Sequence, residues 1–153
     1  MNSQARRILR KLGYDKRPWT FETVERCCEL AGVELTFMPM RRAGVYWMPE
    51  GAPTITLSSS LAGIKKLEAG CHELGHHFEH SPESGLYIPE CKGRREFEAQ
   101  RFAVCALIPE WMRRRLAHQY MLWDLQEEYG YTANLFEFRS QVYHQCGAEW
   151  WKR

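Results

Sequence analysis

The segment CHELGHHFEH, residues 71–80, constrains the fold of this chain more than any other stretch, because it carries four histidines and two glutamates. The apolar residues around it recur at steps of three and four: Ile64, Leu67, Cys71, Leu74 and Phe78. That spacing predicts one long amphipathic helix with a buried apolar stripe, in which Cys71 fills the core. We expect a cap among serines 58–60 and an end at about His80.

Two metal-binding patterns overlap within this helix. The first is His72-Glu73-x-x-His76, in which two histidines one turn apart hold an ion. The glutamate between them is then placed to accept a proton from the water that the ion activates. The second is the inverted pattern His76-x-x-Glu79-His80. A helix that only exposes polar side chains to water explains the same letters, so the segment alone leaves the frame open.

A third ligand is needed to separate these interpretations. Catalytic zinc commonly has three protein ligands, and two histidines with one glutamate form one such set. Glu96 is the first acidic residue of the next predicted helix, beyond a loop over residues 81–93 that can turn the chain back. Glu98 is its rival, and about 200° around the helix separates the two, so only one can face the ion.

The rest of the chain predicts an α+β fold, mostly helical, with a small sheet near the histidine helix. One helix is expected over residues 3–13, ended by Gly13, and another from the Thr20 cap to Gly32. Three short β-prone runs follow, at Val33–Met38, Gly44–Met48 and Thr54–Leu57. Their short connections predict a three-stranded antiparallel meander.

The C-terminal third is expected to be helical. A helix over residues 94–107 breaks near Pro109 and helix continues in pieces beyond it. Residues 122–143 echo the spacing of a helix-turn-helix, but the acidic turn would repel phosphates, so we favour a packed helical cap. The closing residues 150–153, WWKR, are interpreted as a frayed tail or a contact surface for a partner.

Length and composition restrict the class of protein. With 153 residues, 44% hydrophobic and 26% charged, the chain reads as one globular domain over 1–153, with a helical C-terminal part at 109–153. No apolar run suits a membrane span, and the N-terminus lacks the apolar core of a secretion signal. Six cysteines without a CxxC pair then indicate reduced thiols and a cytoplasmic protein. A net charge of +2 gives no case for direct nucleic-acid binding as a function.

Two motifs in order resemble the ImmA/IrrE family of metallopeptidases. They are HELGH at residues 72–76, and EFEAQRFA at 96–103 followed by ALIPE at 106–110. The family pattern is HExxH, then E-x-x-A-N-x-F-A, then a run of small residues ending L-M-P. The resemblance spans about residues 20–145, with Gln100 where the family usually has Asn and Ile108 where Met is usual.

The resemblance implies a zincin-like fold and a zinc-dependent endopeptidase, with manganese as the alternative ion. It implies three metal ligands and one general base: His72, His76 and Glu96, and Glu73. Glu96 is favoured over Glu98, because the family ligand stands three residues before the alanine, here Ala99. The implied partner is a protein substrate, a helix-turn-helix repressor whose cleavage derepresses mobile-element, prophage or stress genes. No membrane partner is implied.

The residues leave three features open. Candidates for the stabiliser of the oxyanion are Tyr87, His118 and His144, each also explained as a structural or surface residue. The substrate is expected along an edge strand beside the histidine helix, from Gly44–Met48 or from Thr54–Leu57. A non-catalytic binding module that keeps the metal, or a toxin–antitoxin partner of a helix-turn-helix protein, explains the same motifs. The intact Glu73 favours an enzyme, since a structural metal site needs no base.

Overall fold

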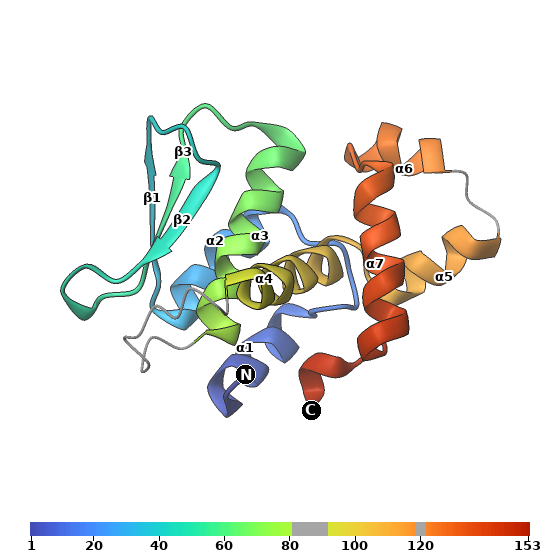
Figure 1. Cartoon of the computed structure of the whole chain (residues 1–153), viewed down its shortest axis with the longest axis horizontal. Helices are drawn as coiled ribbons and strands as arrows, with labels where there is room; N and C mark the ends of the chain where they lie inside the picture. The colour runs from blue at the N-terminus through green and yellow to red at the C-terminus, as the bar shows by residue number, and fades with distance from the viewer. Residues whose placement is uncertain (81–91, 119–121) are drawn as a thin grey trace.

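The computed structural model describes residues 1–80, 92–118 and 122–153 (Figure 1). The elements in chain order are α1 (Ser3–Leu12), α2 (Phe21–Ala31), β1 (Glu34–Met38), β2 (Gly44–Trp47), η1 (Pro49–Gly51), β3 (Thr54–Ser58), α3 (Gly63–Glu79), α4 (Lys92–Leu107), α5 (Glu110–His118), α6 (Leu122–Tyr129), α7 (Ala133–Cys146) and η3 (Trp150–Lys152). The predicted α+β architecture, mostly helical with three strands, is confirmed; its zincin-like character stays a prediction. Within the described ranges, no helix is both long and apolar enough to cross a membrane.

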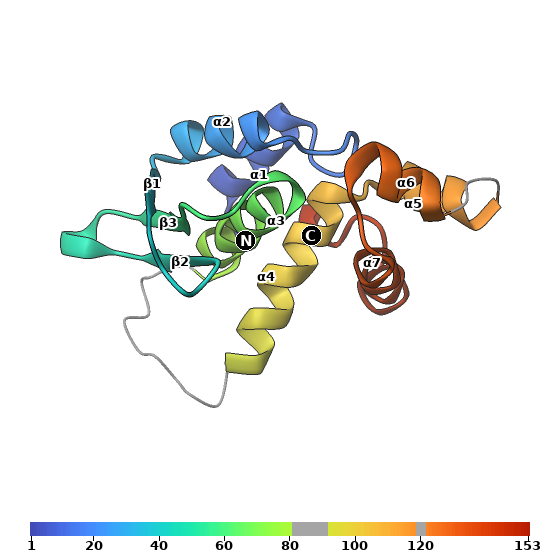
Figure 2. The same ribbon diagram turned by 90° about the horizontal axis from the view of Figure 1, so that it is seen from above.

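The histidine helix α3 lies in the middle of the molecule. Figures 1 and 2 show the sheet on one side of α3 and α4, and α7 on the other. Helix α3 packs against α2, α4, β2 and β3, whereas α7 packs against α4 and α5. The predicted functional helix therefore has the sheet as one neighbour and α4 as another.

Helices α1 and α2 begin and end at the residues that the sequence predicts. The Ala5 amide donates to Asn2 Oδ1 (2.8 Å) at the start of α1, and Thr20 and Thr23 form a reciprocal capping box at the start of α2. Gly13 and Gly32 close the two helices with φ of +70° and +67°, a left-handed conformation that side chains disfavour. Local cap chemistry alone fixes these boundaries.

The predicted antiparallel meander is wrong, because the sheet is mixed and its strand order is β1-β3-β2. Strands β2 and β3 form an antiparallel hairpin, while β1 runs parallel to β3. The loop of residues 39–43 passes over the end of β3, where the Ser58 amide donates to Ala43 O (2.9 Å) and the Ser59 amide to Met38 O (3.0 Å). A short connection limits how far apart two strand ends lie, but another strand can still lie between them.

This order also decides between the two candidate edge strands. Strand β3 is central, so Thr54–Leu57 is excluded as an edge on which a peptide can pair. Strands β1 and β2 are the outer strands, and β2 packs against α3. The candidate that remains beside the histidine helix is β2.

The histidine helix begins later than predicted. Helix α3 starts at Gly63 after Ala62, which offers no side-chain cap, so the predicted serine cap is wrong. Ser58 instead ends β3, and its hydroxyl donates to Met40 O (3.1 Å). The predicted stripe is confirmed, since Cys71, Leu74 and Phe78 are buried and the earlier apolar residues are half-buried.

Helices α3 and α4 touch backbone to backbone at Gly75. A Cβ added to Gly75 would lie 2.7 Å from Ala99 O and 2.8 Å from Ala99 Cα, closer than atoms can approach. Glycine at 75 and alanine at 99 therefore permit a crossing that larger side chains would hold apart. This crossing sets the distance between the residues that α3 and α4 present to each other.

The C-terminal segment is packed, so its interpretation as a frayed tail is wrong, while a contact surface for a partner stays a prediction. The Trp151 side chain is buried, and its ring meets the Tyr14 ring edge-on at 5.1 Å between centroids. The Trp150 ring lies 3.8 Å from the guanidinium carbon of Arg101 on α4. Helices from both ends of the sequence therefore share one core.

The described cysteines are free thiols at positions 27, 28, 71, 105 and 146, and Cys91 lies outside the described residues. All but Cys146 are buried. Burial raises the pKa of Cys28 to about 12, so its thiol stays protonated and unreactive at neutral pH. Cys71 belongs to the core rather than to the metal-binding residues.

Candidate metal centre

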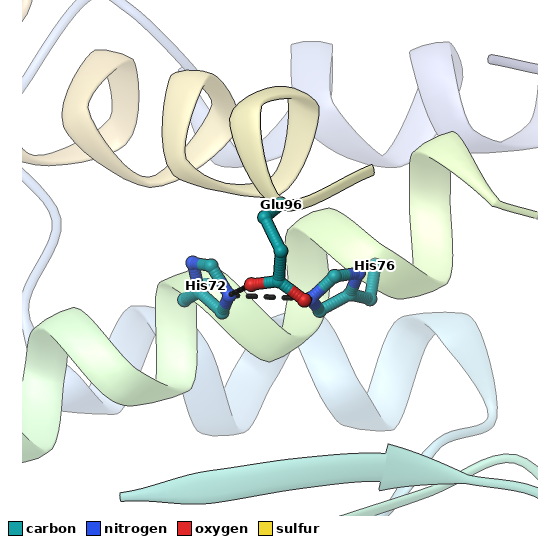
Figure 3. A group of neighbouring side chains, drawn as sticks. All are labelled: His72, His76 and Glu96. Atoms are coloured by element: carbon teal, nitrogen blue, oxygen red, sulfur yellow. Dashed lines mark hydrogen bonds and ion pairs between the residues drawn. The ribbon is translucent and has the colours of Figure 1, made fainter. Parts of the chain in front are cut away.

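Three side chains converge where α4 crosses α3 (Figure 3). His72 and His76 lie one turn apart on α3, with their Nε2 atoms 3.1 Å from each other. Glu96 reaches down from α4 and places one carboxylate oxygen 3.2 Å from His72 Nε2 and the other 3.6 Å from His76 Nε2. These are the three residues that the family resemblance implies as ligands, brought together by the fold.

The spacing of these atoms fits one divalent cation. A tetrahedral zinc ion with bonds of about 2.0–2.1 Å holds its ligand atoms about 3.3 Å apart. The Nε2 atoms of His72 and His76 are 3.1 Å apart, and the Glu96 carboxylate approaches them at 3.2 Å through one oxygen and at 3.6 Å through the other, all close to that value. The Glu96 side chain is 51% exposed, so the group opens to solvent on one side. Such a site offers three protein ligands and an accessible fourth position.

The charge state of His76 suits a ligand. Burial, and secondly the neighbouring His72, lower the pKa of His76 to about 4. At neutral pH the imidazole is therefore uncharged and has a free lone pair. Two imidazole nitrogens that face each other at 3.1 Å, beside a carboxylate, form an electron-rich cluster that a cation would stabilise.

Glu73 occupies a different face of α3, turned toward β2. Its side chain is buried, and the backbone N–H of Tyr46 donates to its carboxylate. Burial raises the pKa of Glu73 to about 7, against the opposing effects of His72 and the Tyr46 hydrogen bond. The carboxyl group can therefore both accept and release a proton near neutral pH.

Strand β2 contributes residues that sequence reasoning missed. A Cβ at Gly44 would lie 2.9 Å from both Glu73 Cγ and Leu57 Cδ2, so a larger residue there would displace one of these side chains. Two residues on, the Tyr46 hydroxyl is hydrogen-bonded to His77 Nδ1 at 3.1 Å. Gly44 and Tyr46 stand two residues apart, so they lie on the same face of the strand, and this much is readable in the sequence. That this face meets Glu73 and His77 becomes clear only once the strand is placed beside α3.

The two residues that belong to the inverted frame alone, Glu79 and His80, point elsewhere. The His80 Nε2–H donates to the Arg95 carbonyl oxygen (3.2 Å), and Glu98 Oε2 lies 3.6 Å from the same nitrogen. Glu98 also accepts from Arg94 Nε (3.0 Å), while Glu79 Oε1 lies 3.6 Å from Arg101 Nη2. Glu98 therefore stands beside His80, and the fold brings Glu96 rather than Glu98 to the two histidines.

The candidates for the oxyanion stabiliser receive no support. Tyr87 and the side chain of His118 lie outside the described residues. His144 is exposed on α7, where its ring contacts the Tyr143 ring, and it is not part of the His72–His76–Glu96 group.

Comparison with known families identifies a match that covers most of the chain. The family model described as the IrrE N-terminal-like domain, Peptidase_M78, matches residues 28–141. The matched range contains α3, α4 and the whole sheet, and with them His72, His76, Glu96 and Glu73. A search of curated proteins found no matching sequence.

Proposed function

The chain belongs to the IrrE N-terminal-like family of peptidases, because the matched residues make up most of its length, and from that premise we propose a metal-dependent endopeptidase that acts at the His72–His76–Glu96 group. One observation carries this proposal: a cation-binding triad open to solvent stands beside a buried carboxylate that is not part of it. A purely structural metal site needs no such neighbour, whereas peptide hydrolysis needs a base.

Each residue has a distinct role in this proposal. His72, His76 and Glu96 would hold the ion, and His₂Glu is a ligand set of zinc peptidases, so zinc is favoured and manganese is the alternative. The chemistry that such an ion supplies is polarisation of the scissile carbonyl and acidification of water. Glu73 accepts the proton from the attacking water and passes it to the leaving amine. The Tyr46 amide and the close approach of Gly44 hold that carboxylate in place.

The edge strand β2 supports an endopeptidase over an enzyme that acts on chain ends. Among the residues that the structure describes, β2 pairs only with β3, and its Gly44–Trp47 backbone lies beside Glu73. An extended peptide paired with the outer edge of β2 would pass the catalytic carboxylate with chain extending in both directions. We propose this edge as the place where the substrate backbone binds.

The substrate that we propose is a helix-turn-helix repressor, cleaved in the cytoplasm to release genes of a mobile element, prophage or stress regulon. Its support is the family resemblance of HELGH and EFEAQRFA, together with the peptidase family match. The recognition is then between proteins and does not require this chain to bind nucleic acid.

The variant Glu73→Gln tests the enzymatic role directly. The amide keeps the shape of the side chain but cannot accept a proton, so cleavage should fall by about 10²- to 10⁴-fold while metal content stays at the wild-type level. We would search the neighbouring genes for a helix-turn-helix protein, co-express each form with it, and read repressor length on a gel and promoter activity from a reporter.

The opposite outcome is equally clear. A binding module would silence the repressor without cutting it, so Glu73→Gln would derepress the promoter as fully as the wild type and leave the repressor at full length. That result would remove the peptidase proposal and leave the metal centre intact. A wild type that binds metal but leaves this repressor whole, while cutting another protein, would remove only the proposed substrate.

A further inference from the structure

A line of hydrogen bonds runs behind the metal centre, from α3 to α4 and back. His72 Nδ1, on the side of the ring away from the group, lies 3.1 Å from Gln100 Oε1. Gln100 Nε2 in turn donates to Glu68 Oε1 at 3.4 Å. Glu68 stands one turn before His72 on α3, and Gln100 stands one turn after Glu96 on α4. The line therefore connects the two helices that supply the ligands.

The chemistry of these groups gives the line a direction. A carboxylate only accepts hydrogen bonds, so Glu68 requires the amide nitrogen of Gln100 to face it. The amide oxygen must then face His72, and an oxygen there requires a hydrogen on His72 Nδ1. A neutral imidazole carries one N–H, so Nε2 is left with a bare lone pair. That lone pair is then free to bind an ion between His76 Nε2 and the Glu96 carboxylate; without an ion, the carboxylate 3.2 Å away competes for the hydrogen at Nε2.

We propose that Glu68 and Gln100 are positioning residues that fix the tautomer of His72 and thereby set the affinity of the centre for its metal. Gln100 holds the imidazole through its oxygen, and Glu68 acts through Gln100 by preventing the amide from flipping. Histidines that bind metals generally donate their second N–H to an oxygen acceptor, and loss of that acceptor weakens metal binding by about 10- to 100-fold. The inference rests on the proposed function in so far as the group binds an ion, but neither residue belongs to the ligand set.

A double-mutant cycle on zinc affinity tests the coupling. Gln100→Leu, close in size but apolar, should weaken zinc binding by about 10- to 100-fold in a competition titration against a chromophoric chelator. Glu68→Leu should weaken it too, because the freed amide can turn its N–H toward His72. In the Gln100→Leu background, Glu68→Leu should cause no further loss, since its effect passes through the missing amide.

The matched control separates hydrogen bonding from charge. Glu68→Gln removes the negative charge but keeps an oxygen that accepts from Gln100 Nε2, so zinc affinity should stay within about twofold of the wild type, far from the 10- to 100-fold loss above. Equal losses in Glu68→Gln and Glu68→Leu would show that the carboxylate acts by charge alone and would overturn the proposal. Wild-type affinity in Gln100→Leu would overturn it as well.

The tautomer itself can be read without metal or activity in Glu96→Ala, which lacks the carboxylate that competes for the hydrogen at Nε2. The ¹⁵N shifts of the His72 ring should show hydrogen on Nδ1 and a bare Nε2; the reverse tautomer would overturn the inference. This measurement also separates the inference about the His72 tautomer from the proposed metal-dependent function. Hydrogen on Nδ1 in this variant, together with a wild type that binds no divalent cation, would remove the metal-dependent function while leaving the hydrogen-bonded line in place.

Discussion

Two charged clusters connect distant parts of this chain, and they differ in whether the chain itself supplies a cation to the carboxylates. One is the Asp15–Glu110–Arg139 cluster, where Arg139 Nη2 lies 2.7 Å from Asp15 Oδ1 and 3.5 Å from Glu110 Oε2. The other is the His72–His76–Glu96 group. The first is closed, since the Arg139 side chain is fully buried, whereas the second presents a half-exposed carboxylate.

The two clusters differ in where the positive charge comes from. Arg139 supplies it from within the chain, and its Nε also donates to the Ile108 carbonyl oxygen (2.7 Å). The Asp15 carboxylate accepts a further bond from the Glu110 amide (2.9 Å) at the start of α5. In the His72–His76–Glu96 group, lone pairs and a carboxylate converge at an opening. A cluster that contains its own cation stabilises a fold, whereas one that lacks a cation at its centre is suited to binding one.

The largest effect on stability is expected from breaking the closed cluster. Arg139→Leu removes the cation and leaves the buried Asp15 carboxylate without its partner, so the free energy of unfolding should fall by about 3–5 kcal/mol in urea titration. The exposed pair of Arg26 and Glu29, 2.7 Å apart, is the control. Arg26→Ala should cost at most about 1 kcal/mol, because water already solvates both charges. Equal losses in the two variants would show that burial does not distinguish these pairs.

The second largest effect on stability is expected at the open His72–His76–Glu96 group, and only when metal is bound. Zinc at 100 times its Kd should stabilise the wild type by about 2.7 kcal/mol. Glu96→Ala should lose this gain, as should His72→Ala and His76→Ala, and each should retain little metal by mass spectrometry. In chelator, Glu96→Ala should unfold within about 0.5 kcal/mol of the wild type, because the side chain is half-exposed.

Glu98 provides the matched control for the open group. It stands two residues from Glu96 on the same helix, but contacts His80 and Arg94. Glu98→Ala should keep both the metal and the stabilisation by zinc. Loss of metal in Glu98→Ala with full occupancy in Glu96→Ala would reverse the assignment of the third ligand.

The smallest effect tests whether the open group depends on the helix crossing. Gly75→Ala forces a methyl group against the Ala99 backbone, which should cost about 1–3 kcal/mol and weaken zinc binding by moving Glu96 away from the histidines. Gly93→Ala, on α4 with nothing within 4 Å of the added carbon, should instead be neutral or stabilise by up to about 1 kcal/mol. Unchanged zinc affinity in a destabilised Gly75→Ala would separate the centre from the crossing.

Local chemistry determined much of this molecule directly from the sequence. The Thr20 cap and the glycine at residue 32 bound α2, because capping involves groups only a few residues apart. The helical period placed His72 and His76 on one face for the same reason. The motif order in turn favoured Glu96 as the third member of the group before any fold was known.

Only the tertiary structure decided what distant segments do to each other. The order β1-β3-β2 depends on the path of a loop over β3, which short connections do not specify. The burial of Glu73 depends on Gly44 approaching from another element, and the closed cluster depends on Asp15 meeting Arg139 from opposite ends of the sequence. Propensities and caps act over a few residues, whereas such contacts depend on how packing brings whole elements together. The residue types that can bind a metal were therefore readable in the sequence, while the environment that sets their charge and orientation came from the fold.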